Sequence, residues 1–259
     1  MFKIKKVFFY IASAFFLVVF LYSTYEVIRF YKTDYLVQKE LNYVNDIANI
    51  PKNIKDTSFL FNNISKDVSH YRNLNINFKK LLLINPDIVA WICIPGTEIN
   101  FPIVKGKDNN HYLNYTFSGQ KHYVGSIFMD YRNSSNFSDL NTIIYGHHIS
   151  NGRMFSDIKK FNNKDFFQNH PFLFIYTPTK TYECSIYSIH IKEYSSEMFD
   201  IQFNSSNEFE TYINQTIDNS NFNRNITINR DNKLVTLTTC VSGKNKDLRY
   251  LLHATMKEI

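Results

Sequence analysis

Residues Leu234–Cys240 read LVTLTTC, a run of apolar and β-branched side chains that closes on a cysteine. Such a run, bounded by polar turn residues, is typical of a β-strand. The strand places a thiol at its end, and the next apolar run begins directly after Arg249. A cysteine is a nucleophile in its thiolate form, and a nearby guanidinium can hold an oxyanion. The pair therefore predicts a thiol enzyme built on a sheet.

A second apolar run ends in histidine. Residues Thr142–His147 read TIIYGH, and a further histidine, His148, follows. Taken singly, a buried cysteine is usually an inert apolar side chain, and an arginine is usually a surface charge. Cysteine, histidine and arginine at the ends of three strands favour catalysis, because neighbouring strands can bring them together.

From Ile88 onward the apolar side chains recur with a period of two, which predicts strands rather than helices. About eight strands with few helices predict a mainly β domain, with a mostly antiparallel sheet closed into a barrel. One helix is expected over Ser206–Asn219, with Ser205 or Ser206 as its N-cap. The predicted strands are Val89–Ile94, Ile99–Val104, Gly125–Met129, Thr142–His147, Phe172–Tyr176, Tyr182–Ile191, Leu234–Cys240 and Leu248–Met256.

An apolar segment near the N-terminus predicts a membrane anchor. No charged residue occurs from Val7 to Tyr25, and Lys3, Lys5 and Lys6 precede the segment. A helix over it is roughly 28 Å long, close to the hydrocarbon core of a membrane at about 30 Å. The positive-inside rule makes this a single-pass protein of the cell membrane, with a cytoplasmic N-terminus and an extracellular catalytic domain. A cleaved signal peptide is the alternative, but the small residues Ala12–Ala14 lie within the apolar run rather than after it.

The regions between the anchor and the barrel read as helical, with apolar residues three and four positions apart. Pro51 and the polar stretch Asn62–Ser69 are expected to interrupt the helices, and Asn85–Asp87 to end the last one. The predicted domains are residues 1–25 as cytoplasmic tip and transmembrane anchor, 26–87 as a helical N-terminal region, and 88–259 as the catalytic β-barrel.

The composition excludes some classes of function. A hydrophobic content of 44% allows a sizeable core, the net charge of +6 is modest, and no arginine-rich patch with interleaved aromatic residues suggests nucleic acid. No group of cysteines or histidines has zinc-site spacing, so we expect no metal and no other cofactor. Three cysteines are an odd number for an exported domain, so at least one is unpaired unless chains cross-link. A Cys93–Cys184 disulfide stays open at this stage.

Five motifs occur in one order along the chain: WICIPGT (residues 91–97), DNNHYLN (108–114), GSIFMDYRN (125–133), YGHH (145–148) and TLTTC (236–240), the last followed by Arg249. In these motifs the chain resembles the sortases, and specifically the class B sortases of Gram-positive bacteria. The resemblance covers roughly Ile88 to Ile259, together with the anchor and the N-terminal helices. It implies a closed eight-stranded sortase-type β-barrel with N-terminal helices and one inserted helix before the cysteine-bearing strand.

The resemblance also implies which residues act. The catalytic residues of the family map to Cys240, Arg249 and His147, the histidine directly after the glycine, rather than to His148. Class B enzymes often have an acidic residue after the cysteine, where this chain has Val241. The substrate-binding positions of the family fall on Asn109, Leu113, Tyr145 and Thr238, and less directly on the segment Tyr194–Phe199.

The implied reaction is transpeptidation at the cell wall. The enzyme would cleave a C-terminal sorting signal similar to Asn-Pro-x-Thr-x in surface proteins after its threonine, and pass the acyl group to an amine of a peptidoglycan peptide. Unperturbed pKa values would leave about 3% thiolate and about a quarter imidazolium at pH 7, so the site must shift them or the enzyme is slow. Alternatives are a thiol endopeptidase that releases the acyl group to water, a pilin-polymerising sortase, and a binding module with a degenerate site. The joint presence of the three candidate catalytic residues disfavours the last.

Overall fold

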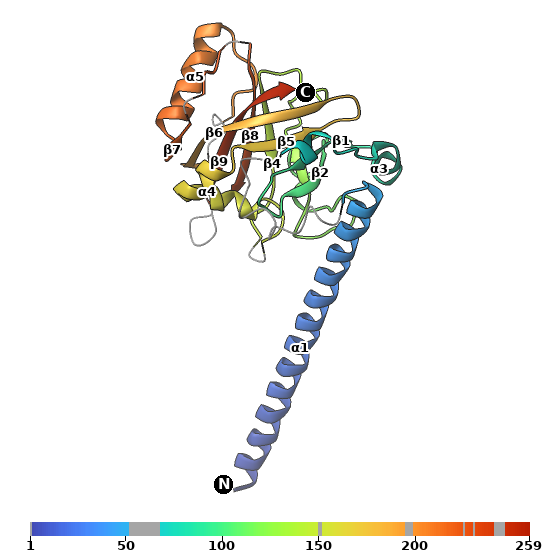
Figure 1. Ribbon diagram of the computed structural model, residues 1–259. Helices are drawn as coiled ribbons and strands as arrows, with labels where there is room; N and C mark the ends of the chain where they lie inside the picture. Colours follow the sequence, from blue (N-terminus) through green and yellow to red (C-terminus); the bar gives the residue numbers. More distant parts are fainter. Residues whose placement is uncertain are drawn as a thin grey trace. The chain divides into compact units, whose positions relative to one another are not determined.

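The computed structural model describes residues 2–51, 68–149, 152–194, 199–224, 226–229, 231–240 and 247–259 (Figure 1). The side chains of residues 2–5 and of Cys240 lie outside this description. By their internal contacts the residues fall into two compact units, Met1–Val44 and Asn45–Ile259. The second unit holds the sheet and all of the predicted site residues.

Helix α1, Phe2–Ile47, runs without a break through the apolar segment and the polar stretch that follows it. Neither glycine nor proline occurs within it, so nothing in the local sequence interrupts the helix. Two residues after its last residue, Asn49 has a φ of 62°, the left-handed conformation that asparagine tolerates after a helix. By length and composition α1 is able to cross a membrane, and it is the one such helix among the described residues.

Two short helices precede the barrel: α2, Ser69–Arg72, and α3, Phe78–Ile84. The side chain of Asn77 accepts a hydrogen bond from the N–H of Lys80 and so caps α3. Helix α3 ends directly before the predicted stop at Asn85–Asp87. Residues 52–67, which hold most of the predicted Asn62–Ser69 loop, lie outside the described residues, and Ser69 begins α2 rather than ending a loop.

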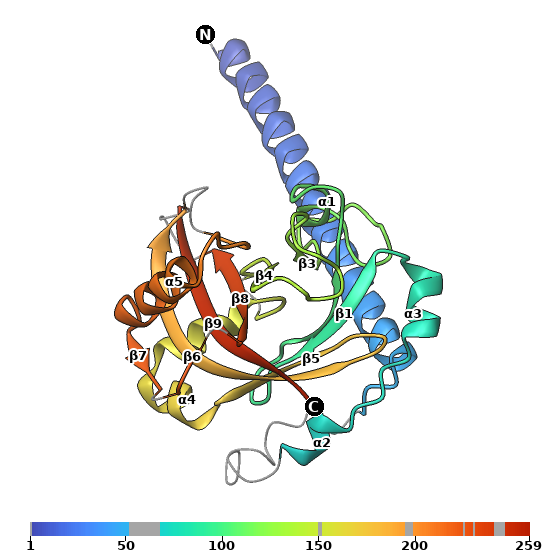
Figure 2. The ribbon, with the colours of Figure 1, turned by 90° about the horizontal axis from the view of Figure 1, so that it is seen from above.

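Nine strands form one sheet in the described part of the chain: β1 (Ile88–Cys93), β2 (Asn100–Val104), β3 (Ile127–Met129), β4 (Asn141–Tyr145), β5 (Phe172–Tyr176), β6 (Thr181–Glu193), β7 (Phe222–Asn223), β8 (Lys233–Cys240) and β9 (Leu248–Glu258). Eight of them follow the order β5-β1-β2-β3-β4-β8-β9-β6, and the pairing of β5 with β6 closes the ring (Figure 2). The short β7 pairs with β6 outside the ring. The predicted eight-stranded, mostly antiparallel barrel is confirmed; β2–β3 and β4–β8 are the parallel pairs among these strands.

Strands β3 and β4 are shorter than predicted. The sequence predicted strands over Gly125–Met129 and Thr142–His147. Gly125 instead turns the chain with a φ of 60°, and a Cβ there would lie 2.6 Å from the carbonyl oxygen of Tyr112. Strand β4 ends at Tyr145 instead of His147. The two histidines, His147 and His148, therefore lie in the connection after the strand rather than within it.

Helix α5, Ser206–Asp218, confirms the predicted inserted helix. The Ser205 side chain caps it by accepting from the N–H of Glu208, whose carboxylate also suits the first turn. The buried face of α5 packs into a cluster formed by Tyr187, Phe209, Tyr212, Ile213 and Leu234. The short elements η3 (His111–Leu113), η4 (Ser156–Asn162), α4 (Lys164–Asn169) and β7 were not predicted.

Cys93 and Cys184 are free thiols in the barrel core, so the disulfide that the sequence left open is not formed. Their side chains are 2% and 0% exposed. Burial raises the pKa of both thiols, which keeps them protonated and inert.

Two buried histidines, His190 on β6 and His253 on β9, stack with their ring centroids 5.1 Å apart. Burial lowers the pKa of His190 to about 4, and the charge of Lys192 adds to this effect. Burial also holds the pKa of His253 well below its ordinary value. Both rings are therefore neutral in the folded protein near neutral pH.

We expect the protein to lose stability as the pH falls below about 6.5, the pKa of an unfolded histidine. In the unfolded chain each of these histidines binds a proton at higher pH than in the folded chain, so the free energy of unfolding falls from about pH 6.5 down to the folded pKa. For His190 alone the loss at pH 5 is about 2 kcal/mol. Thermal midpoints of the full chain in detergent, measured from pH 7 to pH 5, test this. His190→Gln should flatten the dependence, and an unchanged slope in that variant would contradict the assignment.

Candidate active site

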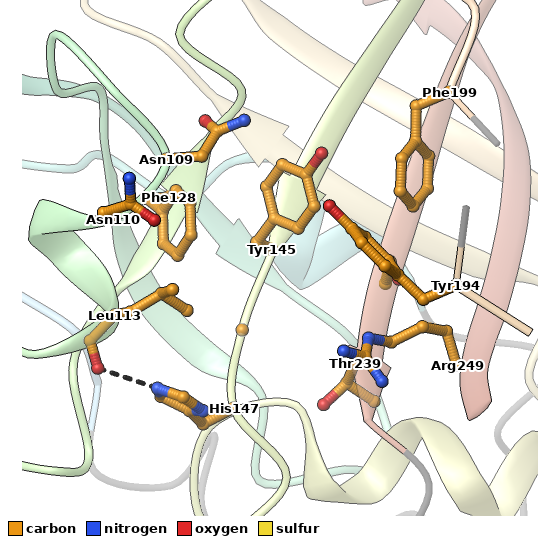
Figure 3. A pocket seen from close by; sticks show the side chains of 12 residues that line it. Asn109, Asn110, Leu113, Phe128, Tyr145, His147, Tyr194, Phe199, Thr239 and Arg249 are labelled. Carbon is orange, nitrogen blue, oxygen red and sulfur yellow. Dashed lines mark hydrogen bonds between the residues drawn. The ribbon is translucent and has the colours of Figure 1, made fainter. Parts of the chain in front are cut away.

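A pocket opens beside the end of strand β8, where residues from several loops and strands meet (Figure 3). All six predicted site residues whose side chains are described line this one pocket: Asn109, Leu113, Tyr145, His147, Thr238 and Arg249. Tyr194 and Phe199, the two ends of the segment to which the resemblance pointed less directly, also line it; residues 195–198 between them lie outside the described residues. The remaining lining residues are Asn110, Phe128, Gly146 and Thr239. Positions that are up to 140 residues apart in the chain (from 109 to 249) are thus brought together by the barrel.

The backbone register brings the ends of three strands to the pocket. Strand β8 pairs antiparallel with β9, and this pairing sets Cys240 opposite Arg249. Strand β4 pairs parallel with β8, and Tyr145 lies opposite Thr238. His147 lies two positions after Tyr145, and Cys240 lies two positions after Thr238. Cys240 is the last residue of β8, whereas β4 has already ended at Tyr145. The Cys240 side chain and Val241 lie outside the described residues.

Gly146 lets the chain turn out of β4 next to the barrel wall. Its N–H donates to the Thr238 carbonyl at 3.2 Å, which extends the parallel pairing by one bond. A Cβ at this position would lie 2.4 Å from Ile127 Cδ1 and 2.7 Å from the Phe155 ring, so a side chain does not fit here. The close packing of Ile127 and Phe155 around Gly146 fixes the position of the backbone at the next residue, His147.

The His147 ring is half-buried, and a backbone carbonyl holds it through a hydrogen bond. Its Nε2 lies 2.7 Å from the carbonyl oxygen of Leu113, shown by the dashed line in Figure 3. A carbonyl only accepts hydrogen bonds, so Nε2 carries a proton and donates it. In the neutral ring Nδ1 then holds the lone pair, and Nδ1 is the atom able to take up and release a proton.

We expect His147→Ala to be nearly inactive and His148→Ala to keep most of its activity. His147 lines the pocket, whereas His148 pairs through its backbone with Met154 and is not among the lining residues. Loss of a general acid and base typically lowers the rate about 10²–10⁴-fold. Initial rates of peptide cleavage by both variants check this. An inactive His148→Ala beside an active His147→Ala would reverse the assignment. Both histidines follow the end of β4 at Tyr145, so the course of the connection after the strand, and not alternation along a strand, separates their surroundings.

Arg249 lies at the pocket with its guanidinium over an aromatic ring. The Cζ atom of Arg249 is 5.1 Å from the centroid of the Tyr194 ring, and Nη1 donates to the Leu248 carbonyl at 3.0 Å. The N–H of Tyr194 donates to the Asp247 carbonyl at 2.7 Å, which joins the end of β6 to the start of β9. These contacts hold a permanent positive charge opposite the Cys240 backbone.

Tyr145 occupies the middle of the pocket in Figure 3, between Asn109 and Leu113 on one side and Arg249 on the other. Its ring stacks on Phe128 with centroids 5.1 Å apart and meets Phe199 edge-on at 5.6 Å. Burial raises the pKa of the Tyr145 phenol far above its usual range, and the neighbouring carboxylate of Asp130 raises it further. The phenol is therefore always protonated.

Two neighbouring threonines on β8, Thr238 and Thr239, are also among the lining residues. The Oγ1 atoms of Thr238 and Thr239 are buried and make no hydrogen bond to described residues. The resemblance predicted Thr238 as a site residue, but not Thr239. The position of Thr239 directly before Cys240 is the sequence feature that could have indicated it.

The chain is similar to proteins of one known family. A family model described as Sortase domain matches residues 92–257. Sortase B of Listeria monocytogenes is 35% identical over 167 residues, which cover 64% of this chain and 68% of that protein. The structure of sortase B from Bacillus anthracis in complex with AAEK1 is 28% identical, has a TM-score of 0.73, and matches over 88% of this chain and 100% of that one. A Staphylococcus aureus sortase B–substrate complex is 28% identical with a TM-score of 0.67, over 70% of this chain and 85% of that one.

Proposed function

The chain belongs to the class B sortases, which are cysteine transpeptidases, and from this we propose that it anchors surface proteins to the cell wall. It cleaves a C-terminal sorting signal similar to Asn-Pro-x-Thr-x after the threonine, holds the acyl group as a thioester on Cys240, and transfers it to an amine of a cell-wall peptide. The observation that carries the proposal is the pairing of Cys240 with Arg249 at a pocket that His147 also lines.

In the first half-reaction the Cys240 thiolate attacks the threonine carbonyl carbon and forms the carbon–sulfur bond. Arg249 donates to the oxyanion that develops, a role that suits a group unable to lose its proton. When the tetrahedral intermediate collapses, the peptide carbon–nitrogen bond breaks. The His147 imidazolium gives its Nδ1 proton to the leaving amine, which departs neutral, and the acyl group remains as a thioester.

In the second half-reaction an amine attacks the thioester carbonyl. His147, now neutral, takes a proton from the attacking nitrogen at Nδ1, and the hydrogen bond from Nε2 to the Leu113 carbonyl keeps the ring in the required tautomer. The carbon–sulfur bond breaks, and Cys240 leaves as thiolate beside the renewed imidazolium. The cycle restores both groups and exchanges one amide bond for another.

The N-terminal helix supports an enzyme that works at a membrane surface. Helix α1 has the length and composition of a membrane span, and the lysine-containing start of the chain precedes the apolar segment. The positive-inside rule then orients the barrel to the outer side, where surface proteins and cell-wall peptides meet.

A cleavage assay with and without amines tests the proposal. The full chain in detergent is given fluorogenic peptides of the pattern Asn-Pro-x-Thr-x, with and without wall-derived peptides that carry a free amine, and the products are identified by mass. An amide joining the threonine to the added amine supports transpeptidation. A free threonine carboxylate as the one product, even with amine present, identifies a thiol endopeptidase. Failure to cleave any peptide of the panel would overturn the proposal.

A further inference from the structure

Asp130 is a fully buried carboxylate directly behind the pocket, and the mechanism above does not use it. It follows β3 and accepts five hydrogen bonds. Its Oδ2 atom accepts from Asn109 Nδ2 at 3.1 Å, from the Tyr145 phenol at 2.8 Å and from Arg132 Nη2 at 2.9 Å. Its Oδ1 atom accepts from the backbone N–H and the Nε of Arg132, each at 2.9 Å. Two pocket-lining side chains are thus tied to one carboxylate oxygen.

Asp130 is ionised despite its burial. Burial raises the pKa of this carboxyl, but the hydrogen bonds and charge of Arg132, with the hydrogen bond from Tyr145, outweigh burial and bring the pKa below its usual range. An ionised carboxylate accepts hydrogen bonds and donates none. The Tyr145 phenol must therefore donate its proton to Asp130. The phenol oxygen can then form a further hydrogen bond only as an acceptor, through its lone pairs.

Asn109 is fixed by the same carboxylate in a single amide orientation. Its Nδ2 donates to Asp130, and its Oδ1 accepts from the N–H of Tyr131 at 3.0 Å. Both contacts require the same orientation of the amide. If its nitrogen and oxygen were exchanged, the amide oxygen would face the carboxylate, another acceptor, and the amide nitrogen would face the backbone N–H, another donor. Asn109 and Tyr145 therefore hold their positions as one hydrogen-bonded unit.

We propose that Asp130 is a positioning residue for substrate recognition, which turns the Tyr145 phenol into a hydrogen-bond acceptor and so selects an N–H group of the bound sorting peptide. The inference rests on the proposed function, because it takes a peptide as the occupant of the pocket. An extended peptide presents main-chain N–H groups at regular intervals, and one of these meets the Tyr145 oxygen. Asp130 itself touches no substrate; it acts through Tyr145 and Asn109.

The alternative is that Asp130 only stabilises the loop that follows β3, through its bonds to Arg132. Asp139 offers a matched control, because its carboxylate also braces this loop. It accepts from Asn133 Nδ2 at 2.9 Å and from the Ser134 N–H at 2.6 Å, and it does not line the pocket. A loop-bracing role predicts that Asp130→Asn and Asp139→Asn behave alike, whereas a recognition role predicts that they differ.

The test measures KM and kcat separately for the full chain in detergent, with the fluorogenic Asn-Pro-x-Thr-x peptide that the wild type cleaves best. In Asp130→Asn an amide nitrogen can take the place of Oδ2, so the phenol rotates and presents its proton to the pocket. We expect KM to rise about 10-fold with kcat within about three-fold, as for the loss of one hydrogen bond. Tyr145→Phe should show a similar rise, and the double variant should be no worse than either single one. Asp139→Asn should keep the wild-type KM even if its thermal midpoint falls.

Methylated peptides extend the test to a chain with Asp130 intact. In each peptide of a series, one main-chain nitrogen that carries a hydrogen is methylated. At one position the methyl group should raise the KM of the wild type about 10-fold. The same peptide should show no such rise in KM with Tyr145→Phe. An unchanged KM in Asp130→Asn, fully additive effects with Tyr145→Phe, or equal sensitivity of wild type and Tyr145→Phe to every methylated peptide would overturn the proposal. If the wild type cleaves no peptide, the proposed function fails instead, so the two failures are distinct.

Discussion

Cys240→Ala is expected to abolish peptide cleavage while leaving the barrel folded. The substitution replaces the thiol by a hydrogen at the end of β8 and leaves the backbone pairing with Arg249 in place. Without sulfur no thioester can form, and neither His147 nor Arg249 supplies another nucleophile. Cleavage of the best peptide of the panel, together with the thermal midpoint of the full chain, measures both effects. Rate loss to background with an unchanged midpoint is the expected result.

The other two cysteines provide the control for that experiment. Cys93 and Cys184 are buried, and burial raises the pKa of each thiol, so neither is available as a nucleophile. Cys93→Ala and Cys184→Ala should keep most of the turnover per folded molecule, although each removes packing from the core. Substantial turnover by Cys240→Ala, or complete loss in either control at full folding, would refute the assignment of the nucleophile.

Sequence patterns predicted the strands well because burial on a sheet leaves a local signature. The run Leu234–Cys240 is almost the whole of β8, and the helix with its Ser205 cap lies where its capping residues predicted it. The parallel pairing of β4 with β8 joins segments about ninety positions apart, and no local pattern carries that information. The resemblance to a family predicted the closed barrel and the site residues, but not which strands pair, so this pairing comes from the structure.

The limits of sequence reasoning fall where contacts between distant segments set the geometry. The predicted strand to His147 ends at Tyr145, and the next residue, Gly146, packs so closely against Ile127 and Phe155 that no side chain fits there. Neither contact is visible in the local sequence. Asp130 lies in a quoted motif, GSIFMDYRN, but its role depends on Asn109 and Tyr145, which other segments contribute. The His147 tautomer likewise depends on a carbonyl 34 positions earlier in the chain.

Arg249→Lys is expected to lose most of the activity although it keeps the positive charge. The guanidinium is planar, lies over the Tyr194 ring, and donates through Nη1 to the Leu248 carbonyl. Its several N–H donors on a rigid frame let one group hold a backbone carbonyl and an oxyanion together, whereas a lysine ammonium carries its donors on one mobile atom. Removal of one oxyanion donor typically costs about 10²–10³ in rate.

The rate of acyl-enzyme formation distinguishes this role from a general effect of charge. In single-turnover experiments with the full chain in detergent, Arg249→Lys should form the Cys240 thioester about 10²–10³-fold more slowly than the wild type. Its KM for the peptide should change much less, because the oxyanion exists in the transition state and not in the bound substrate. If Arg249→Lys forms the acyl-enzyme at nearly the wild-type rate, the positive charge alone is sufficient, and Arg249 has no specific role as an oxyanion donor. A change confined to a rise in KM would instead make Arg249 a contact for the bound peptide. A group that meets only the developing negative charge lowers the activation barrier without strengthening the binding of the substrate, so its loss must slow acylation.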